Sequence, residues 1–175
     1  ISPTPMPARP AAAAAPSPFE PAAWESEGTA IASGTVTEAH EESLSEQAMA
    51  RYQDGAAASE VLDDFITITN AAPRQSAGWT CLAWLQLLCD QPEEALRSAR
   101  LAVKLNGQDP QARINLSLAM LETQAKGVRD HVQVVQQVLA LAPDVSEELK
   151  ASIADGLSRK PGWPALTKVK NWLEL

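Results

Sequence analysis

Pairs of adjacent carboxylates are the residues in this chain best suited by type to general acid–base chemistry. Examples are Asp63-Asp64, Glu93-Glu94 and Glu147-Glu148. Two carboxylates that act on one bond must approach it together, with their carboxyl groups about 5 to 10 Å apart. Adjacent residues on a helix instead point about 100° away from each other. We therefore interpret these pairs as solvated helix faces.

Other reactive side chains are limited to His40, His131, Cys81 and Cys89. The histidines are remote from each other in sequence and no Cys-x-x-Cys pair occurs, so no zinc-binding spacing is present. His131 stands in an apolar stretch, without a serine or cysteine nucleophile at a recognisable turn, which indicates a packing or surface histidine. Glycine-rich phosphate loops are also absent. The sequence predicts that the chain is not an enzyme and binds no metal or cofactor.

The spacing of the two cysteines bears on the cellular compartment of the protein and not on catalysis. Cys81 and Cys89 fall eight residues apart in one predicted helix, a rise of about 12 Å, which is beyond disulfide reach. We expect both thiols to be reduced, which is consistent with a cytoplasmic location.

The N-terminal segment differs in composition from the rest. Residues 1–23 hold many of the 13 prolines and almost no branched aliphatic residues, so they bury too little apolar surface to offset chain entropy. We predict a disordered Pro/Ala-rich linker over 1–39 and one domain over 40–175. Because the chain begins at Ile1 rather than Met, we expect the linker to lead to a segment upstream. No apolar run approaches the roughly 18 residues of a membrane span, so we expect a soluble fragment without direct membrane insertion.

The formal net charge is −8, and it is unevenly distributed. Residues 1–41 carry −4, residues 42–109 carry −5 and residues 110–175 carry +1. An acidic body repels phosphate, so the composition argues against nucleic-acid binding. The acidic residues indicate either a solvated surface that aids solubility or a preference for basic partners.

The elements that would position these residues are helices. From Trp79 to Leu88 and from Ala95 to Leu105, apolar residues recur at three- and four-residue spacings, which places them on one helical face. Asp90-Gln91-Pro92 interrupts the pattern. Asn106-Gly107 then ends the second helix with a residue tolerant of positive φ, and Asp109-Pro110 begins the next with a capping carboxylate and a first-turn proline.

A 34-residue period relates three units, at 42–75, 76–109 and 110–145. The second unit shows the pattern best, with large residues and alanines at set positions of the unit. These residues are Trp79, Leu82, Ala83, Ala95, Ala99 and Ala102. In the first unit, Tyr52, Phe65 and Pro73 fall at positions of the same 34-residue pattern. In the third unit Pro143 falls two residues late, and an insertion around Gln124 to Asp130 would absorb the slip. This pattern resembles the tetratricopeptide repeat (TPR) family, although Gln86 and Gly107 replace its usual Tyr and Pro.

The resemblance implies an all-α fold, a short helical solenoid of antiparallel helix pairs. After the third unit, residues 146–175 form two further predicted helices, which we interpret as a C-terminal capping pair. The alternative is that Trp163 and Trp172, with Lys168 and Lys170, form a docking surface.

In this family the first helices of successive units line a concave groove that binds a partner peptide. Carried over by unit position, the resemblance implies a partner-binding groove formed by Glu46, Gln53, Asp54, Thr80, Trp84, Leu87, Leu88, Ile114, Leu118, Leu121 and Glu122. Trp84 is not required by the repeat pattern. It is either an aromatic anchor for a partner or core packed under a neighbouring segment.

The groove residues also indicate a ligand class. TPR domains that bind acidic C-terminal tails use Lys, Arg and Asn, whereas this groove has Glu46, Asp54 and Glu122. We therefore expect a basic or apolar amphipathic segment of another protein as the partner. The sequence predicts a protein–protein interaction module, such as an adaptor, scaffold or assembly factor. The alternative is the regulatory or scaffolding C-terminal portion of a longer membrane protein or enzyme.

Overall fold

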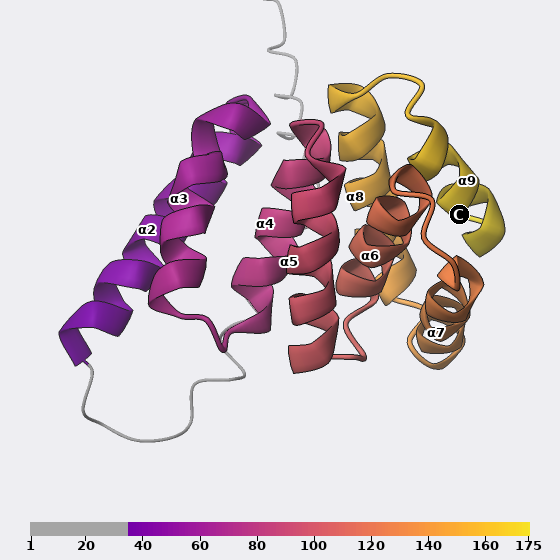
Figure 1. Cartoon of the computed structure of the whole chain (residues 1–175), viewed down its shortest axis with the longest axis horizontal. Coiled ribbons are helices and arrows are strands. Elements are labelled where there is room, and N and C mark those ends of the chain that lie inside the picture. Colours follow the sequence, from indigo (N-terminus) through magenta and orange to yellow (C-terminus); the bar gives the residue numbers. More distant parts are fainter. Residues whose placement is uncertain (1–34) are drawn as a thin grey trace, which may run out of the picture.

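The computed structural model describes the backbone of residues 35–175 and the side chains of residues 44–175. Within this part of the chain all regular structure is helical, as the sequence predicts (Figure 1). The helices are α2 (Thr35–Gln53), α3 (Ala58–Ala71), α4 (Ser76–Leu88), α5 (Pro92–Leu105), α6 (Pro110–Glu122), α7 (Val128–Leu141), α8 (Val145–Arg159) and α9 (Pro164–Leu173).

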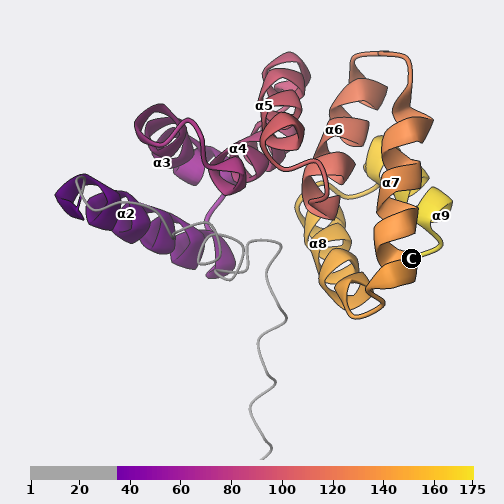
Figure 2. The ribbon, with the colours of Figure 1, turned by 90° about the horizontal axis from the view of Figure 1, so that it is seen from below.

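The first six helices form three consecutive antiparallel hairpins, α2/α3, α4/α5 and α6/α7, and each helix packs on the next. Seen from below, the hairpins follow an arc (Figure 2). Helices α2, α4 and α6 line its inner side, which we call the concave face, and α3, α5 and α7 lie outside. This is the solenoid of helix pairs that the sequence predicts.

Local sequence explains where these helices begin and end. Pro92 and Pro110 occupy first-turn positions, where the missing N–H costs nothing. Asp109 caps α6 by accepting a hydrogen bond from the backbone N–H of Gln111. Asn106-Gly107 ends α5 without positive φ, because the C-cap Asn106 has φ −141° and Gly107 is not among the residues with positive φ. Positive φ occurs instead after α4 and α6, at Asp90 and Gln124.

Small residues bring α4 and α5 close together. Ala83 in α4 and Ala95, Ala99 and Ala102 in α5 are fully buried, as the packing argument predicts. The large residues Tyr52 and Phe65 are buried as well, whereas Trp79 is only half-buried and donates its indole N–H to the Pro73 carbonyl.

The third hairpin has the longer turn that its sequence indicates. Residues 123–127 join α6 to α7, two more than the residues 89–91 that join α4 to α5. Gly127 takes φ +93° there, a conformation that glycine adopts without strain. Val135 of α7 is fully buried as a result of this register.

The two C-terminal helices pack on each other as well as on the hairpins. Helix α9 packs on both α6 and α7 and so covers the end of the solenoid. Helix α8 leaves the row of hairpins and lies on the concave side (Figure 2). Within the predicted C-terminal pair, α9 covers the end of the last hairpin and α8 covers part of the concave side.

At the N-terminal side, α2 begins at Thr35, within the last five residues of the predicted linker. Residues 1–34 of that linker lie outside the described residues. Among residues 35–175, no helix combines the length and apolarity needed to cross a lipid bilayer.

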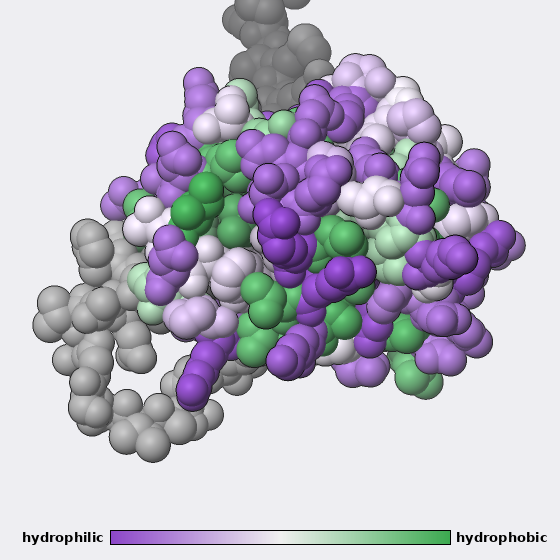
Figure 3. Space-filling model, in the orientation of Figure 1, coloured by the Kyte–Doolittle hydropathy of each residue, from purple (hydrophilic) through white to green (hydrophobic). Residues whose placement is uncertain are grey.

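The outer surface is mainly hydrophilic, with separate hydrophobic patches over α3 and alongside α5 (Figure 3). Ile66, Leu101 and Leu105, each about two-fifths exposed, lie on these two helices. Leu141 at the end of α7 is 88% exposed.

Candidate functional site

The floor of the concave face is an apolar surface provided by α4 and α6. It consists of Trp84, Leu87, Ile114 and Leu118, and each of these side chains is at most 1% exposed. Because these side chains are almost completely shielded from solvent, another element must lie over them. That element is α8.

Helix α8 contacts the floor through one stripe of residues. Leu149, Ser152, Ile153 and Gly156 are its buried positions, spaced three and four residues apart, so they share one face. Leu149 and Ile153 belong to the same hydrophobic cluster as the floor. Helix α8 is therefore an amphipathic helix bound in the concave face of its own chain.

The closest approach is between Gly156 and Trp84. A Cβ added to Gly156 would lie 2.7 Å from Cη2 of Trp84 and 2.7 Å from Cδ2 of Leu166. Any larger side chain would overlap both groups. Glycine thus allows the backbone of α8 to rest against the indole ring, where the sequence pattern indicates only a helix end.

A buried polar network fixes the C-terminal half of α8. The indole Nε1 of Trp84 donates to the Tyr52 hydroxyl at 2.9 Å, and that hydroxyl donates to the carboxylate of Asp155. Burial, followed by the hydrogen bond and charge of Asp155, raises the pKa of Tyr52 well above its usual range. Arg159 lies over the Tyr52 ring at 3.6 Å and pairs with Asp155 at 3.0 Å.

Backbone carbonyls and one carboxylate at the rim bind two basic residues. Arg159 donates to the carbonyls of Tyr52 and Ala56, at 2.7 and 2.8 Å. Lys160 donates to the Leu87 carbonyl at 3.3 Å and to the Asp90 carboxylate at 2.5 Å. These acceptors belong to the ends of α2 and α4, so the C-terminal end of α8 is held by its positive charges.

Trp163 follows α8 and completes the cover over the floor. Its side chain is 1% exposed, and its ring centroid lies 5.7 Å from that of Trp84. The indole Nε1 donates to Glu122 at 2.8 Å, and Lys160 lies 3.9 Å from the same carboxylate. Of the two tryptophans proposed for docking, Trp163 is therefore buried. Trp172 is half-buried, with Arg129 and Lys168 over its ring.

The structure divides the eleven predicted groove residues into three groups. Trp84, Leu87, Ile114 and Leu118 form the buried floor, and Thr80 is buried beside it, bonded to the Ser76 carbonyl and to Asp109. Glu46 and Gln53 are exposed on α2, and Asp54 is exposed in the turn that follows it. Leu88, Leu121 and Glu122 are half-buried at the rim. Trp84 has the environment of core packed under a neighbouring helix, one of its two interpretations.

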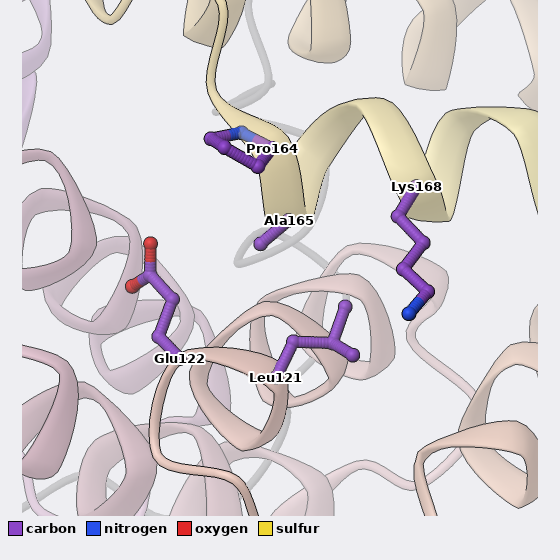
Figure 4. A pocket seen from close by; sticks show the side chains of 5 residues that line it. All are labelled: Leu121, Glu122, Pro164, Ala165 and Lys168. Atoms are coloured by element: carbon purple, nitrogen blue, oxygen red, sulfur yellow. The ribbon is translucent and has the colours of Figure 1, made fainter.

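Two rim residues border an open pocket between α6 and α9 (Figure 4). Leu121 and Glu122 of α6 face Pro164, Ala165 and Lys168 of α9 across it. The carboxylate of Glu122 and the ammonium group of Lys168 lie at opposite ends of the pocket, with apolar atoms between them. This is an accessible part of the predicted groove.

Three residues central to this arrangement, Asp155, Arg159 and Lys160, are missing from the sequence prediction. Repeat positions assign groove residues only within the units, and α8 lies outside them. A signal was present in the sequence, since the basic Arg159-Lys160 pair follows an amphipathic helix. That combination is the ligand chemistry that the acidic, apolar groove predicts.

The candidate catalytic residues are dispersed. No group of three or more metal-binding side chains occurs among the residues with described side chains. His131 is half-buried, and its Nδ1 accepts a hydrogen bond from Arg113 at 2.7 Å. Burial and the Arg113 charge lower the pKa of His131. Burial raises the pKa of the free thiols of Cys81 and Cys89, which disfavours the reactive thiolate.

Together these features define a solenoid of helical hairpins with an amphipathic helix bound in its concave face. No family model matches the sequence, and no curated protein matches it. Among solved structures, the chain is similar to the type III secretion translocator chaperone SycD of Yersinia enterocolitica, in an alternative dimer form. The identity is 18%, the TM-score is 0.56, and the match covers 77% of this chain and 89% of SycD. The similarity shows a shared TPR-like, all-helical fold.

Proposed function

We propose that this chain is a non-enzymatic, TPR-type interaction module whose concave face binds a basic or apolar amphipathic segment of another protein. The observation that carries the proposal is α8 itself. An amphipathic helix that ends in Arg159-Lys160 lies in the concave face, bound by an apolar floor and by acceptors at the rim. A surface with these properties suits a partner helix of the same character.

Three further observations support this role and its location. The similarity to SycD, a translocator chaperone, relates the fold to a protein that serves another protein. The net charge of −8 disfavours nucleic acid as the partner. Free thiols at Cys81 and Cys89 suit a reducing compartment such as the cytoplasm.

Site-specific photo-cross-linking tests the proposal. A photoreactive amino acid in place of Leu121 stands in the pocket of the concave face, and one in place of Leu101 on α5 serves as the matched control on the outer surface. We expect the position 121 variant to form a specific adduct in cell extract. The cross-linked peptide of the partner should be a short basic or apolar helical sequence.

The control at position 101 distinguishes specific binding at the concave face from non-specific cross-linking. Adducts that form equally at both positions, or only at position 101, would contradict binding at the concave face. An acidic tail peptide cross-linked at position 121 would contradict the proposed ligand class.

A further inference from the structure

We infer that α8 is an intramolecular ligand of the concave face, and that the partner segment is a helix that replaces α8 by making the same contacts. This inference rests on the proposed function and names the partner class and its regulation. The partner helix presents a glycine to Trp84, apolar residues to the remaining floor and a basic pair at its C-terminal end.

The first argument is that α8 is not needed to close the solenoid. Helix α9 packs on α6 and α7 directly, and on α8 as well, where Leu166 lies next to Gly156. The last hairpin is thus covered without α8. What α8 covers is the floor, whose exposure in water would be unfavourable in the absence of a partner.

Tethering at both ends allows α8 to leave without unwinding its neighbours. Residues 142–144 connect it to α7, and residues 160–163 connect it to α9, with Gly162 at φ +70°. The second connection includes Lys160 and Trp163, whose hydrogen bonds to Leu87, Asp90 and Glu122 break together with the contacts of α8. Because a tethered ligand has a high local concentration, a partner must bind more tightly than α8 does on its own.

The fit of α8 to the floor is incomplete at one position. The Ser152 hydroxyl is buried without a hydrogen-bond partner. An unsatisfied buried hydroxyl carries a desolvation penalty. A partner helix with alanine at this position avoids the penalty, so α8 is a weaker ligand than the floor permits.

The contacts of α8 specify the rest of the partner. Glycine is required opposite Trp84, since a Cβ would lie 2.7 Å from the indole. One turn later a basic residue reaches the carbonyls of Tyr52 and Ala56, as Arg159 does. A further basic residue reaches Asp90, the acceptor of Lys160. The matching sequence is therefore apolar positions, a glycine and then a basic pair, in helical spacing.

The experiment uses a fluorescent synthetic peptide of residues 144–163 as the probe. Gly156→Leu in the full chain forces its own α8 away from Trp84, and Ala154→Leu, on the exposed side of α8, is the matched control. We expect the peptide to bind the Gly156→Leu chain at least about tenfold more tightly than the wild type or the control, because apparent affinity scales with the fraction of open chains. A peptide that itself carries Gly156→Leu should not bind.

Hydrogen exchange on the wild type provides a second measurement that requires no substitution. Amides of α8 should exchange through an opening of lower free energy than amides of α4 and α6. Exchange of all three helices only through global unfolding would overturn the inference. So would a folded Gly156→Leu chain that fails to bind the wild-type peptide.

Failure of this inference and failure of the proposed function give different results. A partner cross-linked at position 121, with no binding of the α8 peptide to the Gly156→Leu chain, leaves the proposed function standing and removes the role of α8. Peptide binding with no partner adduct at position 121 does the reverse.

Discussion

The indole of Trp84 donates a hydrogen bond to the hydroxyl of Tyr52 at 2.9 Å, and this bond joins α4 to α2 beneath α8. The same hydroxyl donates to Asp155, so one oxygen links three helices. The rings of Tyr52 and Trp84 are both buried. Loss of this oxygen leaves the buried indole N–H of Trp84 without its acceptor and removes one donor from the half-buried Asp155, which keeps its ion pair with Arg159.

Tyr52→Phe should therefore reduce the free energy of unfolding by about 1 to 3 kcal/mol. The ring, with Arg159 over it, is retained, so the loss reports the hydroxyl. Urea denaturation gives the value. A double-mutant cycle with Asp155→Ala should show coupling, and strictly additive losses would mean that the bond between Tyr52 and Asp155 contributes nothing.

The ionisation of Tyr52 provides a spectroscopic test, because it is the only tyrosine in the chain. Its pKa is raised by burial and by Asp155. We expect no phenolate absorbance in the native protein up to about pH 11, and a midpoint of about 10 in urea. A raised native pKa stabilises the fold below the unfolded pKa, and this stabilisation is lost as the pH rises above it. Phenolate absorbance from a folded protein near pH 10 would show that Tyr52 is not enclosed by α8.

Acid should weaken the fold partly through His131. Its native pKa is lowered by burial and by Arg113, whereas the unfolded chain binds a proton near pH 6.5. The unfolded state therefore gains protons first, and stability falls as the pH drops below about 6.5. His131→Gln should reduce the difference in urea midpoint between pH 8 and pH 5.5. An unchanged difference would exclude His131 as a contributor.

Helix α9 should be essential to the fold. Leu166 is fully buried, so Leu166→Ala should cost about 2 to 5 kcal/mol. Asn171→Ala, on the exposed side of α9, should cost less than about 0.5 kcal/mol. Deletion of residues 163–175 should abolish cooperative thermal unfolding. A truncated protein that melts like the wild type would favour α9 as a docking helix instead.

Repeat spacing was enough to predict the three hairpins. Consecutive helices pack on each other in these hairpins, and the 34-residue period reflects this repeated packing. Ala95, Ala99 and Ala102 are buried where the pattern places them. The longer turn before α7 could also be predicted, because Pro143 falls two residues late.

The position of α8 could not be predicted in the same way. Its contacts with Tyr52 and Trp84 join residues far apart in the chain, and no repeat position encodes them. Amphipathicity indicates that α8 has a buried face but not which surface covers it. Gly156 is typical of a helix end by sequence, and only the adjacent indole explains its place inside the helix.

The contact between Tyr52 and Asp155 also affects how the domain unfolds, because it spans 103 residues. In an open repeat array each unit contacts only its neighbours, so the ends can fray independently. Here one helix near the C-terminus fastens α2 to the rest of the array. Fraying of the first hairpin is suppressed while α8 is bound, and the array regains the independence of its units only after α8 has left.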